Sequence, residues 1–233
     1  MKAQCYSIFL AIHVAGGFTA LVTGLLVLIA RKAGAFHKTT GMVYYWGMAI
    51  VFITTLILLG LQPGRENLWF LGAVGIVSFY QTFTGRLRVK KKLNAYKVGW
   101  IDRISLGLVV LTGFACLAAA FHYFSLEDWF RLSLFLFFAT IAFTTAFEDI
   151  KIFQGKPKPE HANWVAYHAA RMIGSYAATV TAFVVNVVPR HLPEETPMVF
   201  FLLLWIAPGV LIGFFGGRMQ KREILNRKMN LAY

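Results

Sequence analysis

The chain alternates between long apolar runs and short polar segments. The apolar runs cover residues 5–30, 42–61, 67–85, 104–124, 130–147, 164–188 and 198–217, with Gln81, Thr82 and Thr84 interrupting the third. Each run is close to the roughly 20 residues that an α-helix needs to cross the hydrocarbon core of a bilayer. Turn residues such as Gln62-Pro-Gly64 separate neighbouring runs. The pattern predicts an all-α, polytopic membrane protein, a seven-transmembrane-helix bundle that forms one domain, 1–233.

The composition agrees with this pattern and excludes several classes of protein. With 58% hydrophobic and 14% charged residues, the chain is too apolar for a soluble globular domain. The first run is too long for a signal peptide and is followed by Arg31 and Lys32, so it is predicted to remain a membrane span. Two cysteines, Cys5 and Cys116, cannot supply a disulfide framework or a thiolate metal site. A retinal-binding rhodopsin is excluded, because its last span needs a lysine and 197–217 has none.

Basic residues are concentrated on alternate connections between the runs. The segments 31–41, 86–103, 148–163 and 218–233 carry three, seven, three and five lysine or arginine residues, which is 18 of the 23 in the chain. Cytoplasmic segments of membrane proteins carry such an excess. The sequence therefore predicts an external N-terminus and a cytoplasmic C-terminus in the plasma (inner) membrane. The net charge of +13 is expected to contact anionic lipid headgroups, and no nucleic acid is expected as a partner.

A histidine lies inside the first apolar run, above a face of small residues. His13 is followed on one helical face by Gly17, Ala20 and Gly24. One interpretation is close helix packing through these small residues, with His13 hydrogen-bonded to a neighbouring helix. The other is a metal or haem ligand, because a flat macrocycle needs a wall without side chains beside its axial histidine. The sequence leaves both open.

Four histidines divide between two depths in the predicted membrane. His13 and His122 are expected near the outer leaflet, and His37 and His168 near the inner one, with His37 in the turn between the first two spans. A helix between His13 and His37 would be about 36 Å long, so these two cannot share a metal. A pair at each leaflet would suit a transmembrane electron carrier with two haems. Alternatively, His122 is an ordinary residue at the membrane boundary.

The inner histidines are predicted to lie near two acids. Glu148 and Asp149 follow the fifth run, and Arg171 comes one turn after His168. Two imidazoles and a carboxylate, from His37, His168 and Asp149, would suit zinc or iron with an open coordination position. The spacing thus predicts one candidate metal site at the inner end of the bundle.

The alternative for the same residues is an ion pair without a metal. A charged arginine within a span needs a partner, and the sixth run itself contains no acid. Arg171 is then expected to bond Asp149, or less favourably Glu148, while His168 points at a backbone carbonyl or a tyrosine hydroxyl. In a further alternative, Arg171, Ser175 and Thr179 line a polar path for an anion or a lipid headgroup.

Three passages resemble an uncharacterised family of bacterial multi-pass membrane proteins. They are Ile12-His-Val-Ala-Gly-Gly17, the pair Arg31-Lys32 with His37-Lys-Thr-Thr-Gly-Met-Val-Tyr44, and His168-x-x-Arg-Met-x-Gly-Ser175. The matching positions are His13, Arg31, Lys32, His37, Gly41, His168 and Arg171. This family has a domain of unknown function, so the resemblance implies no activity. The histidines of the first two spans are also distantly similar to those of cytochrome b561-type haem bundles, which implies haem b as a cofactor.

Three functions follow from these alternatives. The first is a membrane redox protein for electron transfer that binds haem b or a divalent metal through His13, His37, His122 and His168. The second is a metal-dependent membrane hydrolase acting on lipid, with zinc or iron on His37, His168 and Asp149. The third is a transporter or assembly factor without a cofactor, which could also form a homo-oligomer. The redox function ranks first, because the histidines divide between both leaflets.

Overall fold

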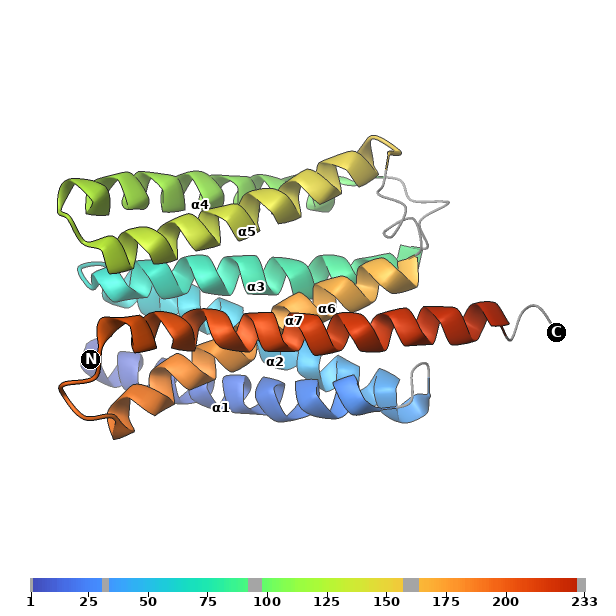
Figure 1. Cartoon of the computed structure of the whole chain (residues 1–233), viewed down its shortest axis with the longest axis horizontal. Helices are drawn as coiled ribbons and strands as arrows, with labels where there is room; N and C mark the ends of the chain where they lie inside the picture. The colour runs from blue at the N-terminus through green and yellow to red at the C-terminus, as the bar shows by residue number, and fades with distance from the viewer. Residues whose placement is uncertain (1, 31–33, 92–97, 157–163, 230–233) are drawn as a thin grey trace. The chain divides into compact units, whose positions relative to one another are not determined.

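The computed structural model describes residues 2–30, 34–91, 98–156 and 164–229 (Figure 1). Over these ranges the chain forms α1 (Lys2–Ile29), α2 (Ala35–Leu61), α3 (Glu66–Lys91), α4 (Trp100–Ser125), α5 (Trp129–Phe153), α6 (Trp164–Val187), a 3₁₀ turn η3 (Val188–His191) and α7 (Met198–Met229). Within the described ranges, seven helices are long and apolar enough to cross a membrane, as predicted. Parts of all four basic segments, including Arg31 and Lys32, lie outside the described residues.

Several helices are longer than the apolar runs that predict them. The sequence indicated that His37 lies in the turn between two helices. In the structure α2 begins at Ala35, so His37 lies in the first turn of this helix. α3 continues to Lys91, α5 to Phe153 and α7 to Met229. Hydropathy marks only the part of a helix that suits hydrocarbon, whereas lysine, arginine and glutamate also favour helix. Glu148 and Asp149 consequently lie inside α5, about one helical turn before its end.

Aspartate side chains at two helix starts accept hydrogen bonds from backbone N–H groups. The Asp102 carboxylate accepts a bond of 2.8 Å from the Gly99 N–H, just before α4. The Asp128 carboxylate accepts one of 3.0 Å from the Arg131 N–H, in the first turn of α5. Such caps satisfy donors that a helix cannot pair internally. They fix where α4 and α5 begin.

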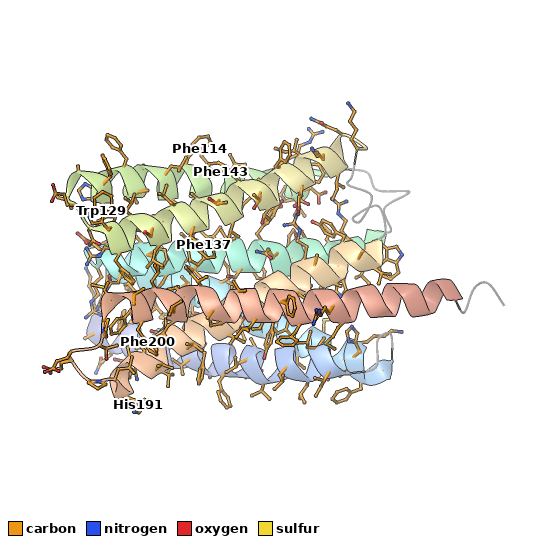
Figure 2. The ribbon with its side chains drawn as sticks, in the orientation of Figure 1. Phe114, Trp129, Phe137, Phe143, His191 and Phe200 are labelled. Carbon is orange, nitrogen blue, oxygen red and sulfur yellow. The ribbon has the colours of Figure 1, made fainter. Side chains whose placement is uncertain are left out.

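Tryptophans begin three of the helices. Trp100, Trp129 and Trp164 are the first residues of α4, α5 and α6. Trp129 is exposed and extends from the end of its helix (Figure 2). Tryptophan is enriched where a membrane span enters the headgroup region, because its ring is apolar and its N–H is polar. The helix ends therefore carry the anchors expected of membrane spans.

The residues group into two compact units that share three helices. The first contains Met1–Tyr80 and Leu108–Ala142, and the second contains Gln81–Gly107 and Phe143–Tyr233. α1 and α2 belong to the first unit and α6 and α7 to the second, while α3, α4 and α5 contribute to both. The single domain stays a prediction.

Small residues bring α1 and α2 together in the first unit. A Cβ atom on Gly47 would lie 3.2 Å from the Gly16 carbonyl oxygen and 3.3 Å from the Ala20 Cβ. Gly16, Ala20 and Gly24 are the buried residues of α1. Such close backbone approach is how small residues promote helix association in membranes, where lipid provides no hydrophobic drive.

Contacts between aromatic rings also join helices of this unit. The Phe52 and Phe79 rings are stacked with their centroids 4.8 Å apart. The Phe70 ring meets those of Phe135 and Phe138 edge to face, at 5.0 and 5.1 Å. Edge-to-face and offset-stacked rings are the favoured arrangements of aromatic pairs. These contacts join α2 to α3 and α3 to α5.

In the second unit, α6 packs against α7 through another glycine. A Cβ atom on Gly216 of α7 would lie 2.9 Å from Ile173 Cγ2 of α6. Only a residue without a side chain allows this separation of the two helices. The opposite face of α6 carries polar residues, which form the candidate site.

Candidate functional site

Polar side chains lie in a row on one face of α6. Tyr167, Arg171 and Ser175 are four residues apart, so they share a face, and all three are buried. Within the second unit, this face contacts the 143–153 part of α5 and the 81–91 part of α3. The local sequence thus places a hydroxyl, a cation and a phenol inside the unit.

Arg171 forms an ion pair with Asp149 of α5. Its Nη2 donates to Asp149 Oδ1 at 3.0 Å and to the Thr145 carbonyl oxygen at 3.1 Å. Glu148 Oε2 lies 3.5 Å from the same nitrogen. Arg171 is 4% exposed and Asp149 is 0% exposed. The predicted ion pair is confirmed, with Asp149 as the nearer of the two acids.

Tyr167 completes the surroundings of the Asp149 carboxylate. Its hydroxyl donates to Asp149 Oδ1 at 2.6 Å, so this one oxygen accepts from both Tyr167 and Arg171. The Arg171 guanidinium carbon also lies 4.9 Å from the centre of the Tyr167 ring. Hydrogen bonds to a charged acceptor are stronger than neutral ones, and a cation over a tyrosine ring adds a further attraction. The three side chains therefore hold one another in place.

α3 contributes hydrogen bonds from the other side. The His168 Nδ1 donates to the Gly85 carbonyl oxygen at 2.9 Å, as predicted for the form of the site without a metal. The hydroxyls of Thr82 and Ser175 are hydrogen-bonded to each other at 2.5 Å. Because a later residue of α6 meets an earlier residue of α3, the two helices are antiparallel here.

Two glycines set the spacing between α3 and α6. A Cβ atom on Gly85 would lie 2.9 Å from both Arg171 Cβ and Met172 Cε. A Cβ atom on Gly174 would overlap the side-chain amide of Gln81. The two helix backbones are therefore close, and protein atoms fill the space between them.

Arg88 of α3 is a second buried cation in this region. It is 2% exposed, and its guanidinium carbon lies 5.4 Å from the centre of the Tyr167 ring and 5.6 Å from that of Phe153. Tyr167 is consequently in contact with two arginines, Arg88 and Arg171. We call the set Arg88, Glu148, Asp149, Tyr167 and Arg171 the charged cluster.

The charged cluster balances its charges. Two arginines accompany two carboxylates, and the two closest members of opposite charge, Arg171 and Asp149, are both buried. Removing one partner of such a pair leaves an uncompensated charge in a medium that solvates it poorly. The cluster thus places a buried carboxylate directly beside a buried cation.

His13 occupies the place expected for helix packing. Its Nδ1 lies 3.0 Å from Thr54 Oγ1 of α2. Because Thr54 donates its own hydrogen to the Ile50 carbonyl oxygen at 2.6 Å, the imidazole is the donor in this pair. The packing interpretation is confirmed. α2 packs against the small-residue face of α1, which leaves haem or metal binding by His13 an untested prediction.

The other two histidines have different surroundings. His122 is exposed in the last turn of α4, with its ring 5.3 Å from that of Tyr123. This is the setting of a residue at the membrane boundary, whereas His13 contacts α2. His37 is half-buried in α2 of the first unit, and His168 belongs to the second unit. The approach of His37 to His168 stays a prediction.

The metal hypothesis gains no support from the described side chains. Among them, no three histidine, cysteine, aspartate or glutamate residues are grouped as ligands for an ion. Asp149 Oδ1 is already bonded to Arg171 and Tyr167, and the adjacent guanidinium would repel a cation. A zinc or iron site on His37, His168 and Asp149 remains an untested prediction, as does the lipid hydrolase built on it.

The sequence interpretation missed the contributions of Arg88, Tyr167 and Thr82. It placed Arg88 in a polar connection, while the structure places it inside α3. The sequence nevertheless contains a signal for Arg88. Gln81, which interrupts the third apolar run, precedes Arg88 by seven residues, or about two helical turns, so the two share a helix face. Polar residues that recur on one face of a membrane helix indicate contact with another polar helix.

Glu148 and Ser175, which the sequence placed near Arg171, both lie in this region. Ser175 is fully buried and Glu148 is partly exposed beside Arg171. Thr179 donates to the Ser175 carbonyl oxygen within α6, which continues the polar row. The chain matches no family model, no curated protein and no solved structure, so the resemblance to a multi-pass membrane family stays a prediction.

Proposed function

We propose that the protein is a membrane transporter that moves protons, or an ion coupled to protons, with the charged cluster as its working site. The observation that carries this proposal is the Asp149–Arg171 pair, which is buried between two helices that are long and apolar enough to span a membrane. Ionisable residues within a membrane are costly, and they mark ion pathways and proton relays. A purely structural helix contact could use apolar residues at lower cost.

The proposal includes an orientation for the bundle. An external N-terminus and a cytoplasmic C-terminus in the plasma (inner) membrane follow from the excess of basic residues on alternate connections. In this orientation α5 ends on the cytoplasmic side. The charged cluster, about one helical turn before that end, would then exchange protons with the cytoplasm.

The cluster can alternate between two charge states. A proton that binds the Asp149 carboxylate cancels its charge and weakens its bond to Arg171, which is left with Glu148, 3.5 Å away, as its acidic partner. When the proton leaves, the carboxylate recovers its charge and the pair re-forms. Tyr167 and Arg88 face the same region from α6 and α3. A change of partner for Arg171 is the kind of two-state element that a transporter needs.

Proton flux into liposomes tests this function. The purified full chain is reconstituted with a pH-sensitive dye inside, and a pH gradient and a membrane potential are imposed. We expect flux above that of empty liposomes, and we expect Asp149→Asn, which keeps the size but removes the charge, to abolish most of it. Asp128→Asn is the matched control, because Asp128 also pairs with an arginine, at 3.5 Å, but at the surface.

Two results would contradict the transport proposal. One is a wild-type protein that is folded and inserted but carries no flux under any imposed gradient or accompanying ion. The other is an Asp149→Asn variant as active as Asp128→Asn.

A second candidate is the haem or metal redox protein, favoured by the hydrogen bonds of two histidines. Carbonyl oxygens only accept, so His168 Nδ1 carries a hydrogen, as does Nδ1 of His13 beside Thr54. In a neutral imidazole this leaves Nε2 with a lone pair, which is the tautomer that a ligand histidine needs. An absorption spectrum and elemental analysis of detergent-purified protein test it. A Soret band or stoichiometric iron that His168→Ala and His13→Ala each lower would support it over transport.

A further inference from the structure

The Tyr167 ring contacts two buried arginines. Its ring centre is 4.9 Å from the Arg171 guanidinium carbon and 5.4 Å from that of Arg88. Its hydroxyl donates to Asp149 Oδ1. The phenol therefore connects a cation on α3 with the ion pair between α5 and α6.

The cation of Arg88 is almost completely removed from solvent. Its long side chain lies against two aromatic rings, those of Tyr167 and Phe153, and both rings belong to helices of the second unit. A cation over an aromatic face draws electron density toward itself and makes a phenol hydroxyl a better hydrogen-bond donor. The hydroxyl of Tyr167 donates to the carboxylate on which the proposed function rests.

We propose that Arg88 is a positioning residue of the charged cluster that acts on Asp149 through the Tyr167 ring. This inference rests on the proposed function, since it gives Arg88 a part in proton exchange at Asp149. Arg88 fixes the ring and strengthens the hydrogen bond from the Tyr167 hydroxyl to Asp149 Oδ1. The burial of Arg88 against the Tyr167 ring supports this role.

The first test observes Tyr167 directly and does not need transport. Ultraviolet resonance Raman spectra of the detergent-purified full chain are recorded, and subtracting the Tyr167→Phe spectrum isolates the Tyr167 bands. Arg88→Met keeps an unbranched apolar stem but removes the cation. In this variant the Tyr167 bands that report hydrogen-bond donation should move toward those of a weaker donor. In Arg88→Lys, which keeps a cation, they should stay near their wild-type positions.

Arg218→Met is the matched control. Arg218 also lies over an aromatic ring, 4.2 Å from the centre of Phe214, but it is exposed on α7. This variant should leave the Tyr167 bands and the proton flux unchanged. Unchanged Tyr167 bands in Arg88→Met, or bands displaced as far by Arg88→Lys as by Arg88→Met, would overturn the inference. If Arg88→Met does not fold, the Arg88→Lys spectrum decides. Displaced Tyr167 bands in that variant would overturn the inference.

The second test measures flux in a double-mutant cycle. Arg88→Met should lower the proton flux by about 3- to 30-fold, the range expected for the loss of a desolvated cation–π contact. In a Tyr167→Leu background the same substitution should have no further effect, because its route to Asp149 is gone. Multiplicative effects of the two substitutions would show that Arg88 acts independently of Tyr167 and would overturn the inference. Absence of flux in the wild type would instead contradict the transport function and leave the Raman result to decide.

Discussion

At the residue scale, the central feature is one carboxylate oxygen with two donors. Asp149 Oδ1 accepts from the Tyr167 hydroxyl at 2.6 Å and from Arg171 at 3.0 Å. Because all three side chains are buried, each of them would otherwise be left with a polar atom or charge unsatisfied. The three side chains therefore depend on one another, and the loss of the acid should cost more than the loss of any surface ion pair.

Asp149→Ala should lower the free energy of unfolding by about 3–5 kcal/mol, because it leaves Arg171 buried without its nearest acid. Asp128→Ala, which removes the surface pair with Arg131 and the hydrogen bond that caps α5, should cost only about 0.5–2 kcal/mol. Thermal unfolding in detergent, with both variants measured under the same conditions, checks the difference. Equal losses for the two would show that burial of the Asp149 pair carries no energetic consequence.

The hydrogen bond of His13 gives a second prediction at this scale. Thr54→Val keeps the shape of the side chain but removes the oxygen that accepts from His13 Nδ1. We expect a loss of about 0.5–1.5 kcal/mol in unfolding free energy, the net contribution of one hydrogen bond, because Thr55 Oγ1 lies 3.5 Å from the same nitrogen. Thr140→Val is the control, since the exposed Thr140 hydroxyl donates to the Leu136 carbonyl of its own helix. Similar stability of both variants in detergent would argue against the α1–α2 hydrogen bond.

At the element scale, glycines decide which helices approach closely. Gly47 lets α2 reach α1, Gly216 lets α7 reach α6, and Gly85 lets α3 reach the Arg171 turn of α6. Glycine is a poor helix former, so each of these glycines lowers the stability of its own helix. The closer packing that it allows between two helices offsets this cost. Glycines in open positions of other helices lack this compensation.

Gly85→Ala and Gly107→Ala should therefore change stability in opposite directions. A Cβ atom on Gly85 would meet Arg171 Cβ at 2.9 Å, so we expect a loss of about 1–3 kcal/mol from overpacking. A Cβ atom on Gly107 in α4 meets nothing within 4 Å, so alanine should gain up to about 1 kcal/mol from helix propensity. Chemical unfolding of the two single variants measures both signs. A stabilised Gly85→Ala variant would mean that α3 and α6 are not in close contact.

At the scale of the whole molecule, the charge distribution predicts which ends of the helices face the cytoplasm. The prediction concerns the α4–α5 connection on one side and the α5–α6 connection on the other. Few basic residues follow α4, whereas the segment after α5 belongs to the basic set. Positively charged segments are retained on the cytoplasmic side during insertion.

Cysteine labelling in intact cells checks this orientation. In a Cys5→Ser background, Ser125→Cys at the end of α4 should react with a membrane-impermeant maleimide from outside. Lys156→Cys, which follows α5 and is exposed, should react only after the membrane is opened. Cys116 is buried and serves as the internal negative control. The reverse pattern of labelling would invert the proposed topology and place the charged cluster at the outer side.

The sequence by itself determined the seven helices and the need for an acid beside Arg171. Both are local consequences of hydropathy: an apolar run of sufficient length forms a membrane helix, and a charge inside it requires compensation. Hydropathy does not locate helix ends in polar sequence. The sequence therefore predicted that His37 and Arg88 lie in connections, whereas they lie within α2 and α3.

Only the tertiary structure decided which partners these residues have. Tyr167 shares the Asp149 carboxylate oxygen with Arg171, and α2 occupies the face beside His13. Each of these outcomes depends on the rotation and spacing of two helices that are distant in sequence. Those quantities are set by side-chain volume at the helix contacts, which hydropathy and charge do not encode.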